Sequence, residues 1–289
     1  MSASPPSLTA ILGLDLSVDI VDIGANPIDG DPPYKGLLQC GAARLVGFEP
    51  NPGALARLNR AKGPSETYLP YAVGDGGRHT LNLCQAEGMT SLLTPNRTFF
   101  QYFHGFSDWA RVVRKMEVDT VRLDDVEQIR RLDYLKIDIQ GGELTVFKNA
   151  PRRLAECLVI QTEVEFLPLY EGQPLFSEVE MHLRALGFVF HRFWPLRTRV
   201  IKPMLIDNDP YKGLSQVVDG DAVFVRDFTR FELLDSAQLL KLALVMHDVY
   251  RSFDVALRAL LTHDRRENTS YVQRYLGGGA VAAGAGSNP

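Results

Sequence analysis

The chain has 289 residues, of which 45% are hydrophobic and 23% charged, with a formal net charge of −4. These values are ordinary for a folded globular protein. The negative net charge argues against non-specific electrostatic binding of nucleic acid, which needs a basic surface. No apolar stretch approaches the ~18 residues of a membrane span, and the N-terminus lacks the charged and apolar segments of a signal peptide. We therefore expect a cytoplasmic protein with no nucleic-acid partner and no membrane span.

Strands and helices alternate from residue 18 onward. Apolar runs predict buried strands, and the amphipathic runs between them predict helices. In the first part of the chain the predicted strands cover residues 18–24, 44–50 and 66–73, and the predicted helices cover 33–41 and 52–61. A hairpin-like piece at 79–84 then precedes a long insertion at 85–117.

The later part of the chain continues this alternation but ends differently. Predicted strands cover 133–139, 157–166, 187–194 and 222–227, and predicted helices cover 142–149 and 176–186. Near-continuous apolar strands separated by helices indicate a mostly parallel sheet covered on both faces. The last two strands have no helix between them, which predicts an antiparallel edge. We therefore expect an α/β fold with a doubly wound, seven-stranded, Rossmann-like sheet of the methyltransferase type.

The chain divides into four predicted parts. Residues 1–17 are expected to be a short, partly mobile lead-in, and residues 18–227 to form the main domain. Residues 228–276 predict a helical extension, because apolar residues recur there at helical spacing. We expect this extension to serve packing or to join two copies into a homo-oligomer. Residues 277–289 are rich in Gly and Ala and are expected to be disordered.

A candidate cofactor pocket begins at the end of the first predicted strand. Asp22, Gly24 and Asn26 stand there in the string DIGAN, where the ligand of an open α/β sheet binds. No GxGxxG motif for a pyrophosphate is present. A carboxylate and an amide at this point suit a ligand with a cationic amino-acid end and no phosphate.

The next two strands add to this pocket. Glu49 ends the second strand, where an acidic residue accepts the ribose hydroxyls of an adenine nucleoside. Asp75 follows the third strand, where the adenine would lie. The ordered set predicts S-adenosylmethionine as the cofactor.

Five segments of the chain resemble the FkbM-type methyltransferase family. They are DIGAN, GFEPNP at 47–52, AVGD at 72–75, TVRLDD at 120–125 and DYLKIDIQGGE at 133–143. The resemblance covers roughly residues 18–194, in the order of the family. It implies O-methylation of a hydroxyl on a sugar, a glycan or a secondary metabolite. The acceptor is thus expected to be a small molecule or a glycan.

Two features depart from the family pattern. The family usually has Glu where this chain has Gln140, and an amide neither takes up a proton usefully nor carries charge. The turn after DIGAN is also extended by residues 27–33. Both departures leave the predicted cofactor intact and weaken the catalytic assignment.

The candidate catalytic residues end the fourth and fifth strands. Lys136 and Asp138 alternate onto one side of the fourth strand. Asp138 is nearest the strand end and is our candidate for a base or an acceptor-positioning group, with a helix-capping carboxylate as the alternative. Glu163 is the third candidate. Glu163 or Glu165 could instead pair with Asp138 around a divalent cation, but without a spacing motif we assign no metal ligands and leave the metal requirement open.

Candidate acceptor-binding residues lie in two long connections. The insertion at 85–117 is rich in aromatic residues, among them Tyr102, His104 and Trp109, which predict either a sugar platform over the pocket or a small core of their own. Arg111, Arg114 and Lys115 follow at helical spacing, where they could meet an anionic group. The connection at 195–221 is expected on the ligand side, so that it adds Arg197 and Tyr211, with Arg199, Lys202 and Lys212, to the acceptor wall.

Two other functions remain as alternatives. A nicotinamide-dependent oxidoreductase could use the same sheet, but the missing GxGxxG disfavours it. A non-catalytic binding or assembly module on a methyltransferase fold would fit Gln140 and the helical C-terminus.

Overall fold

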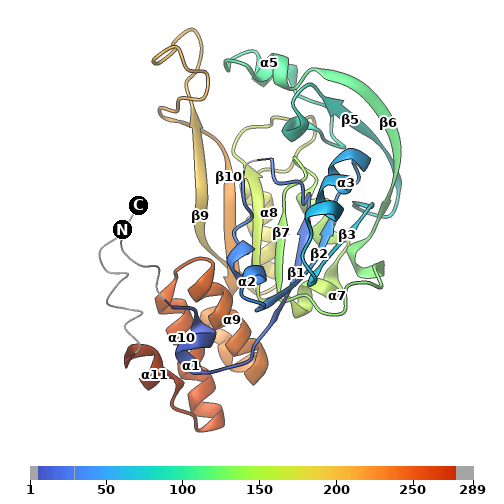
Figure 1. Ribbon diagram of the computed structural model, residues 1–289. Coiled ribbons are helices and arrows are strands. Elements are labelled where there is room, and N and C mark those ends of the chain that lie inside the picture. Colours follow the sequence, from blue (N-terminus) through green and yellow to red (C-terminus); the bar gives the residue numbers. More distant parts are fainter. Residues whose placement is uncertain (1–5, 29, 278–289) are drawn as a thin grey trace.

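The fold is built around one seven-stranded sheet, seen in a computed structural model that describes residues 6–28 and 30–277 (Figure 1). The strand order is β3-β2-β1-β7-β8-β10-β9. The strands are β1 (Val18–Ile23), β2 (Ala43–Phe48), β3 (Glu66–Leu69), β7 (Tyr134–Ile137), β8 (Val159–Glu165), β9 (Phe188–Arg199) and β10 (Gln216–Arg226). The first five are parallel, and β10 runs antiparallel to both β8 and β9. The predicted doubly wound Rossmann-like methyltransferase sheet with an antiparallel edge is therefore confirmed.

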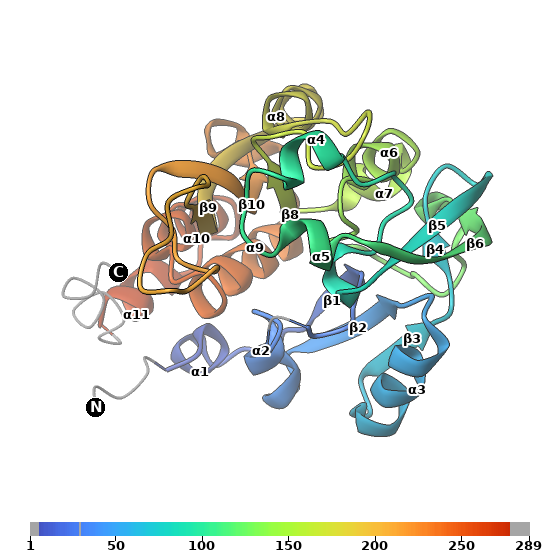
Figure 2. The ribbon, with the colours of Figure 1, turned by 90° about the horizontal axis from the view of Figure 1, so that it is seen from above.

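Helices cover both faces of this sheet. In Figure 2, α6 (Glu143–Lys148) and α8 (Phe176–Ala185) lie on one side, and α1 (Leu8–Leu12) and α2 (Lys35–Gln39) lie on the other. Helix α7 (Pro151–Glu156) joins α6 and α8 in one apolar core, and α3 (Pro52–Ala61) packs beside β3. All six side chains of β1 are buried, as its apolar sequence predicts for a strand covered twice.

The C-terminal helices are part of the sheet's cover. The short helix η3 (Phe228–Leu233) leads into α9 (Ser236–Asp248), α10 (Phe253–Glu267) and α11 (Tyr271–Gly277). Leu239, Ala243 and Leu244 of α9 belong to the same core as Val18 and Ile20 of β1. The apolar side chains that suggested self-association therefore pack within the chain. The predicted disordered tail, apart from Gly277, lies outside the described residues, as does the start of the lead-in.

A second, three-stranded sheet stands beside the carboxyl ends of the main strands. It has the order β4-β6-β5 and consists of β4 (Ala72–Val73), β5 (Arg78–Cys84) and β6 (Val112–Val121). The predicted third strand at 66–73 is therefore two strands in different sheets. The insertion is mostly irregular, with the short helices η1 (Glu87–Met89), α4 (Arg97–Phe100) and α5 (Phe106–Trp109), while η2 (Leu123–Asp125) follows β6.

Two sequence expectations need correction here. Arg114 and Lys115 lie on β6, which pairs with β5, so their expected helical arrangement is wrong. β9 continues past its predicted end at residue 194, and β10 begins before its predicted start at residue 222. Arg197 and Arg199 therefore lie on a strand. A hairpin partner stabilises each of these extensions through main-chain hydrogen bonds that no local pattern reveals.

Within residues 6–28 and 30–277, none of the helices has the length and apolar character of a membrane-spanning segment.

A buried ionic contact ties α9 to the sheet. Lys241 Nζ lies 2.6 Å from an Asp133 carboxylate oxygen and 3.5 Å from an Asp19 oxygen. The same Asp133 oxygen accepts the Asp19 backbone N–H at 2.7 Å. Burial raises the pKa of Asp133. Lys241 is the cation beside Asp133, whereas Asp19 is also bound by Arg44 at 2.8 Å.

We expect Lys241→Met to lower the free energy of unfolding by about 3 kcal/mol, because it leaves the buried Asp133 carboxylate without its counter-charge, while Asp19 keeps Arg44. Urea unfolding monitored by circular dichroism measures this. The double variant Lys241→Met/Asp133→Asn should recover much of the loss, since Asn still accepts the Asp19 N–H. A single-variant loss of less than about 0.5 kcal/mol, the size of an ordinary surface effect, would contradict this role.

Candidate active site

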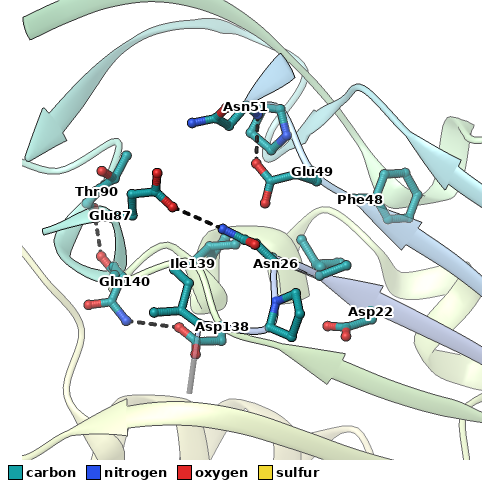
Figure 3. A pocket seen from close by; sticks show the side chains of 18 of the residues that line it. Asp22, Asn26, Phe48, Glu49, Asn51, Glu87, Thr90, Asp138, Ile139 and Gln140 are labelled. Carbon is teal, nitrogen blue, oxygen red and sulfur yellow. Dashed lines mark hydrogen bonds between the residues drawn. The ribbon is translucent and has the colours of Figure 1, made fainter. Parts of the chain in front are cut away.

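A cavity of about 1090 Å³ opens at the carboxyl ends of β1, β2 and β7. The strand order reverses between β1 and β7, which is where ligands bind in open α/β sheets. Eight of the residues that we predicted for the site line it, namely Asp22, Gly24, Asn26, Glu49, Arg114, Lys136, Asp138 and Arg197. Figure 3 shows the labelled residues of β1, β2 and the turn after β7 gathered around this space.

Gly24 allows two turns to meet at the centre of the site. It adopts a φ of +82°, and a Cβ atom there would lie 2.0 Å from the carbonyl oxygen of Asp138. No other residue fits such a contact. The close approach that Gly24 permits is therefore to the backbone of the turn after β7.

Asn26 and Glu49 face the cavity from neighbouring strands (Figure 3). Asn26 Nδ2 donates a hydrogen bond of 3.4 Å to Glu87 Oε2. Glu49 Oε1 accepts the Asn51 backbone N–H at 2.7 Å. Burial raises the pKa of Glu49, and the Asn51 N–H opposes this shift. These contacts fix both side chains while they still line the pocket.

The floor of the cavity holds a lysine among carboxylates. Lys136 Nζ lies 3.4 Å from Asp22 Oδ1, and the Tyr34 hydroxyl donates to the other oxygen of Asp22. Burial opposes the charge on Lys136, but Asp22, Asp138 and Asp221 together raise its pKa above the ordinary value. Lys136 is therefore protonated near neutral pH, so it can hold or orient a group but cannot act as a base.

Gln161 and Asp221 also line the cavity, and sequence reasoning missed both. Gln161 Nε2 donates to Asp221 Oδ2 at 2.6 Å, and the Tyr250 hydroxyl donates to Gln161 Oε1 at 2.8 Å. Gln161 is the direct neighbour of Lys136 in the β7–β8 register. Only that register, and the antiparallel entry of β10, bring these residues together.

Gln140 joins the remaining candidate residues. Its amide Nε2 donates to Asp138 Oδ1 at 2.9 Å and to Glu163 Oε2. Arg197 donates to Glu163 Oε1 at 2.7 Å and also pairs with Asp219. Glu163 thus lies directly behind the cavity lining. Burial, with Asp138 and Glu165 close by, holds its pKa well above the usual range.

The divalent cation considered between Asp138 and Glu163 or Glu165 has no set of ligands in the described part of the chain. Among residues 6–28 and 30–277, no group of three or more His, Cys, Asp or Glu side chains is arranged to hold an ion. The Gln140 amide stands between Asp138 and Glu163, where a shared cation was considered.

The other predicted site residues lie outside the cavity. The Asp75 carboxylate is bound by His79 at 2.7 Å and by the Gly77 N–H at 2.8 Å, in a turn beyond β4. Trp109 stacks on Tyr211 with ring centroids 4.9 Å apart. The buried aromatic residues Phe100, Phe103 and Phe106 form a small core with Tyr170, as one of the two alternatives predicted, and Trp109 packs on the β9–β10 loop.

Tyr102 and His104 belong to this same arrangement. His104 Nε2 lies 2.9 Å from the Met204 carbonyl oxygen, and Lys202 donates its backbone N–H to the Tyr102 carbonyl. The cavity rim is formed instead by the β5–β6 hairpin and the segment around η1, including Leu81, Leu83, Ser91, Arg114 and Met116.

The sequence matches the model of one known protein family. The sequence model described as the Methyltransferase FkbM domain matches residues 22–190, which is more than half of the chain. The chain belongs to the FkbM methyltransferase family. The match begins at Asp22 and covers every strand end of the cavity except those of β9 and β10.

Solved structures give a more distant likeness for this FkbM domain. A precorrin-6y C5,15-methyltransferase from Geobacter metallireducens GS-15 is 12% identical with a TM-score of 0.36, covering 76% of this chain and 85% of its own. A SAM-dependent methyltransferase from Aquifex aeolicus is 10% identical with a TM-score of 0.32, covering 75% and 87%. LepI in complex with SAM is 12% identical with a TM-score of 0.34, covering 78% and 49%. Comparison with curated protein sequences gave no match.

Glu143 of the FkbM domain gives a test of the buried acidic groups behind the site. Its carboxylate accepts the Ile139 N–H at 2.8 Å, and burial raises its pKa from 4.5 to about 7. The folded state therefore holds a proton that the unfolded state releases between these values, so this group's contribution to stability falls as pH rises through that window.

Relative to Glu143→Gln, we expect the wild type to lose roughly 2–3 kcal/mol of unfolding free energy between about pH 5 and pH 7.5. Urea unfolding at a series of pH values measures the difference. The Gln variant keeps the acceptor for the Ile139 N–H, so it is its own matched control. Parallel pH curves for the two proteins would contradict the raised pKa.

Proposed function

We propose that the chain transfers a methyl group from S-adenosylmethionine to a hydroxyl group. The observation that carries this proposal is the joint position of Asp22, Asn26 and Glu49 in one cavity beside the turn after β7. Glu49 suits the ribose hydroxyls, because a carboxylate accepts two hydrogen bonds at once. Asp22 and Asp138 supply negative charge for a cationic amino-acid and sulfonium group.

The same charges disfavour a dinucleotide. A pyrophosphate needs bare amides at a helix start or a cluster of cations. The cavity lining instead carries the carboxylates of Asp22, Glu49 and Asp138, and the nearest cation, Lys136, is already shared among acidic groups. We therefore retain the nicotinamide-dependent alternative only as an outcome of the binding test.

Binding of S-adenosylhomocysteine by calorimetry tests the cofactor. We expect micromolar binding to wild type, none of NAD, and a loss of about 10- to 100-fold in Glu49→Gln, the size of a lost charge-assisted hydrogen bond. Glu117→Gln is the matched control, because Glu117 is an exposed carboxylate that contacts Thr80 on the second sheet. Absence of binding to well-folded wild type would refute the cofactor assignment.

Asp138 is our candidate for the catalytic base. As the acceptor oxygen forms its bond to the methyl carbon, the carbon–sulfur bond breaks, and the hydroxyl proton passes to the Asp138 carboxylate and on to solvent. S-Adenosylhomocysteine is then released with the methylated product. Lys136 and Glu163 act on Asp138 from either side, Lys136 by its charge and Glu163 through Gln140.

For the acceptor we infer a hydroxyl-rich small molecule or glycan. Trp194, Gln161, Asp221 and Arg197 line the same cavity beyond Lys136. An indole face beside carboxylate, amide and guanidinium groups suits a ring that carries several hydroxyls. Of the residues proposed from the sequence for acceptor contact, Arg197 and Arg114 line the cavity, so the proposal no longer rests on Tyr102, His104, Trp109 or Tyr211.

A panel of hexoses, oligosaccharides and hydroxylated aromatic compounds tests transfer, with mass spectrometry detecting the gain of one methyl group. We expect at least one acceptor, and a loss of about 10²–10⁴ in rate for Asp138→Asn with S-adenosylhomocysteine affinity retained. Asp119→Asn, an exposed change on β6, should leave the rate unchanged. Cofactor binding without transfer to any acceptor would favour the non-catalytic binding module.

A further inference from the structure

Gln140 makes an unusual set of contacts at the edge of the cavity. Its backbone has a φ of +60°, rare for a residue with a side chain. Its Nε2 group donates to both Asp138 and Glu163, while its Oε1 accepts the Tyr170 hydroxyl at 3.1 Å. In this orientation the amide hydrogens face two carboxyl oxygens and the amide oxygen faces a hydroxyl group, so all three partners are complementary to it.

The two carboxylates that Gln140 joins lie in an acidic region. Glu163 is also close to Glu165 and Asp219, and Arg197 is the cation paired with it. Two carboxylates one side chain apart need a shared proton, a cation or a neutral donor between them. In this chain both hydrogens of the Gln140 amide fill that place, and Asp138 is held with one oxygen bound.

We propose that Gln140 is a positioning residue whose amide takes the place of a divalent cation between Asp138 and Glu163, so that this site works without such an ion. An NH₂ group is a donor and cannot ligate a cation, while the amide oxygen that could do so is turned toward Tyr170. The benefit for methyl transfer rests on the proposed function. The prediction that wild type binds no divalent cation at this position is independent of the proposed function.

A carboxylate at position 140 would reverse the situation. Gln140→Glu places a third acidic side chain against Asp138 and Glu163, and three converging carboxylates are the ligands that hard divalent cations prefer. The structure therefore predicts that one isosteric substitution creates a metal site in a chain that has none at this position.

Mn²⁺ titration of the full-length protein, followed by electron paramagnetic resonance, tests the proposal. Wild type should not bind Mn²⁺ at this position. Its affinity for S-adenosylhomocysteine should change by less than about twofold when EDTA replaces Mg²⁺. Gln140→Glu should bind one Mn²⁺ per chain, at least about tenfold more tightly than wild type. Gln140→Glu/Glu163→Gln should lose that binding, and Gln101→Glu controls for the added charge at an exposed site.

Three results would overturn the proposal. The first is stoichiometric Mn²⁺ binding to wild type that Asp138→Asn abolishes, and the second is a folded Gln140→Glu that binds no Mn²⁺. If Gln140→Glu does not fold, Mn²⁺ is titrated into Gln140→Ala, which removes the amide between the two carboxylates. The third contradicting result is that Gln140→Ala binds no Mn²⁺. Failure of the proposed function would appear separately, as lost S-adenosylhomocysteine binding in wild type with or without Mg²⁺.

Discussion

The site depends on the close contact between Gly24 and the carbonyl oxygen of Asp138. Two parallel strands, β1 and β7, end side by side at the point where the strand order reverses, and their turns cross with no room for a Cβ atom. This crossing places the DIGAN turn against the Asp138–Gln140 turn. The groups that we assign to the cofactor and the group that we assign to proton removal therefore share one rigid backbone contact.

Charge balance is the second constraint. The cavity and the layer behind it hold more carboxylates than cations, and two partly buried cations are shared: Lys136 among Asp22, Asp138 and Asp221, and Arg197 among Glu163, Asp219 and Asp221. Burial raises the pKa of Asp22, Glu49 and Glu163 in this setting. Such a site favours a cationic ligand over an anionic one. Gln140 adds two hydrogen-bond donors without adding charge.

The sequence predicted the parts of the site that depend on strand ends. Asp22, Gly24, Glu49 and Asp138 each close a strong apolar run, and parallel strands bring such ends together whatever the loops do. Gln161 and Asp221 could not be found in this way, because their meeting depends on the β7–β8 register and on β10 entering between β8 and β9. Their local sequence gives no sign of either.

The loops were the least predictable part. The aromatic insertion was expected over the pocket or as a small core, and the second alternative is confirmed: Phe100, Phe103 and Phe106 form a small core with Tyr170. Trp109 of the insertion also stacks on Tyr211 of the β9–β10 loop. An aromatic-rich segment predicts that it will be buried, but a sequence does not say against which surface. Gln140 stood out in the sequence as a departure from the family, while its function as a donor between two carboxylates required the geometry.

A crystal structure of the protein with S-adenosylhomocysteine would test the central claim most directly. Our account predicts the ribose hydroxyls on Glu49, the amino-acid end beside Asp22 and Asn26, and the sulfur facing Asp138, with the Gln140 amide still between Asp138 and Glu163. A nucleoside bound elsewhere, or one whose sulfur points away from Asp138, would contradict it.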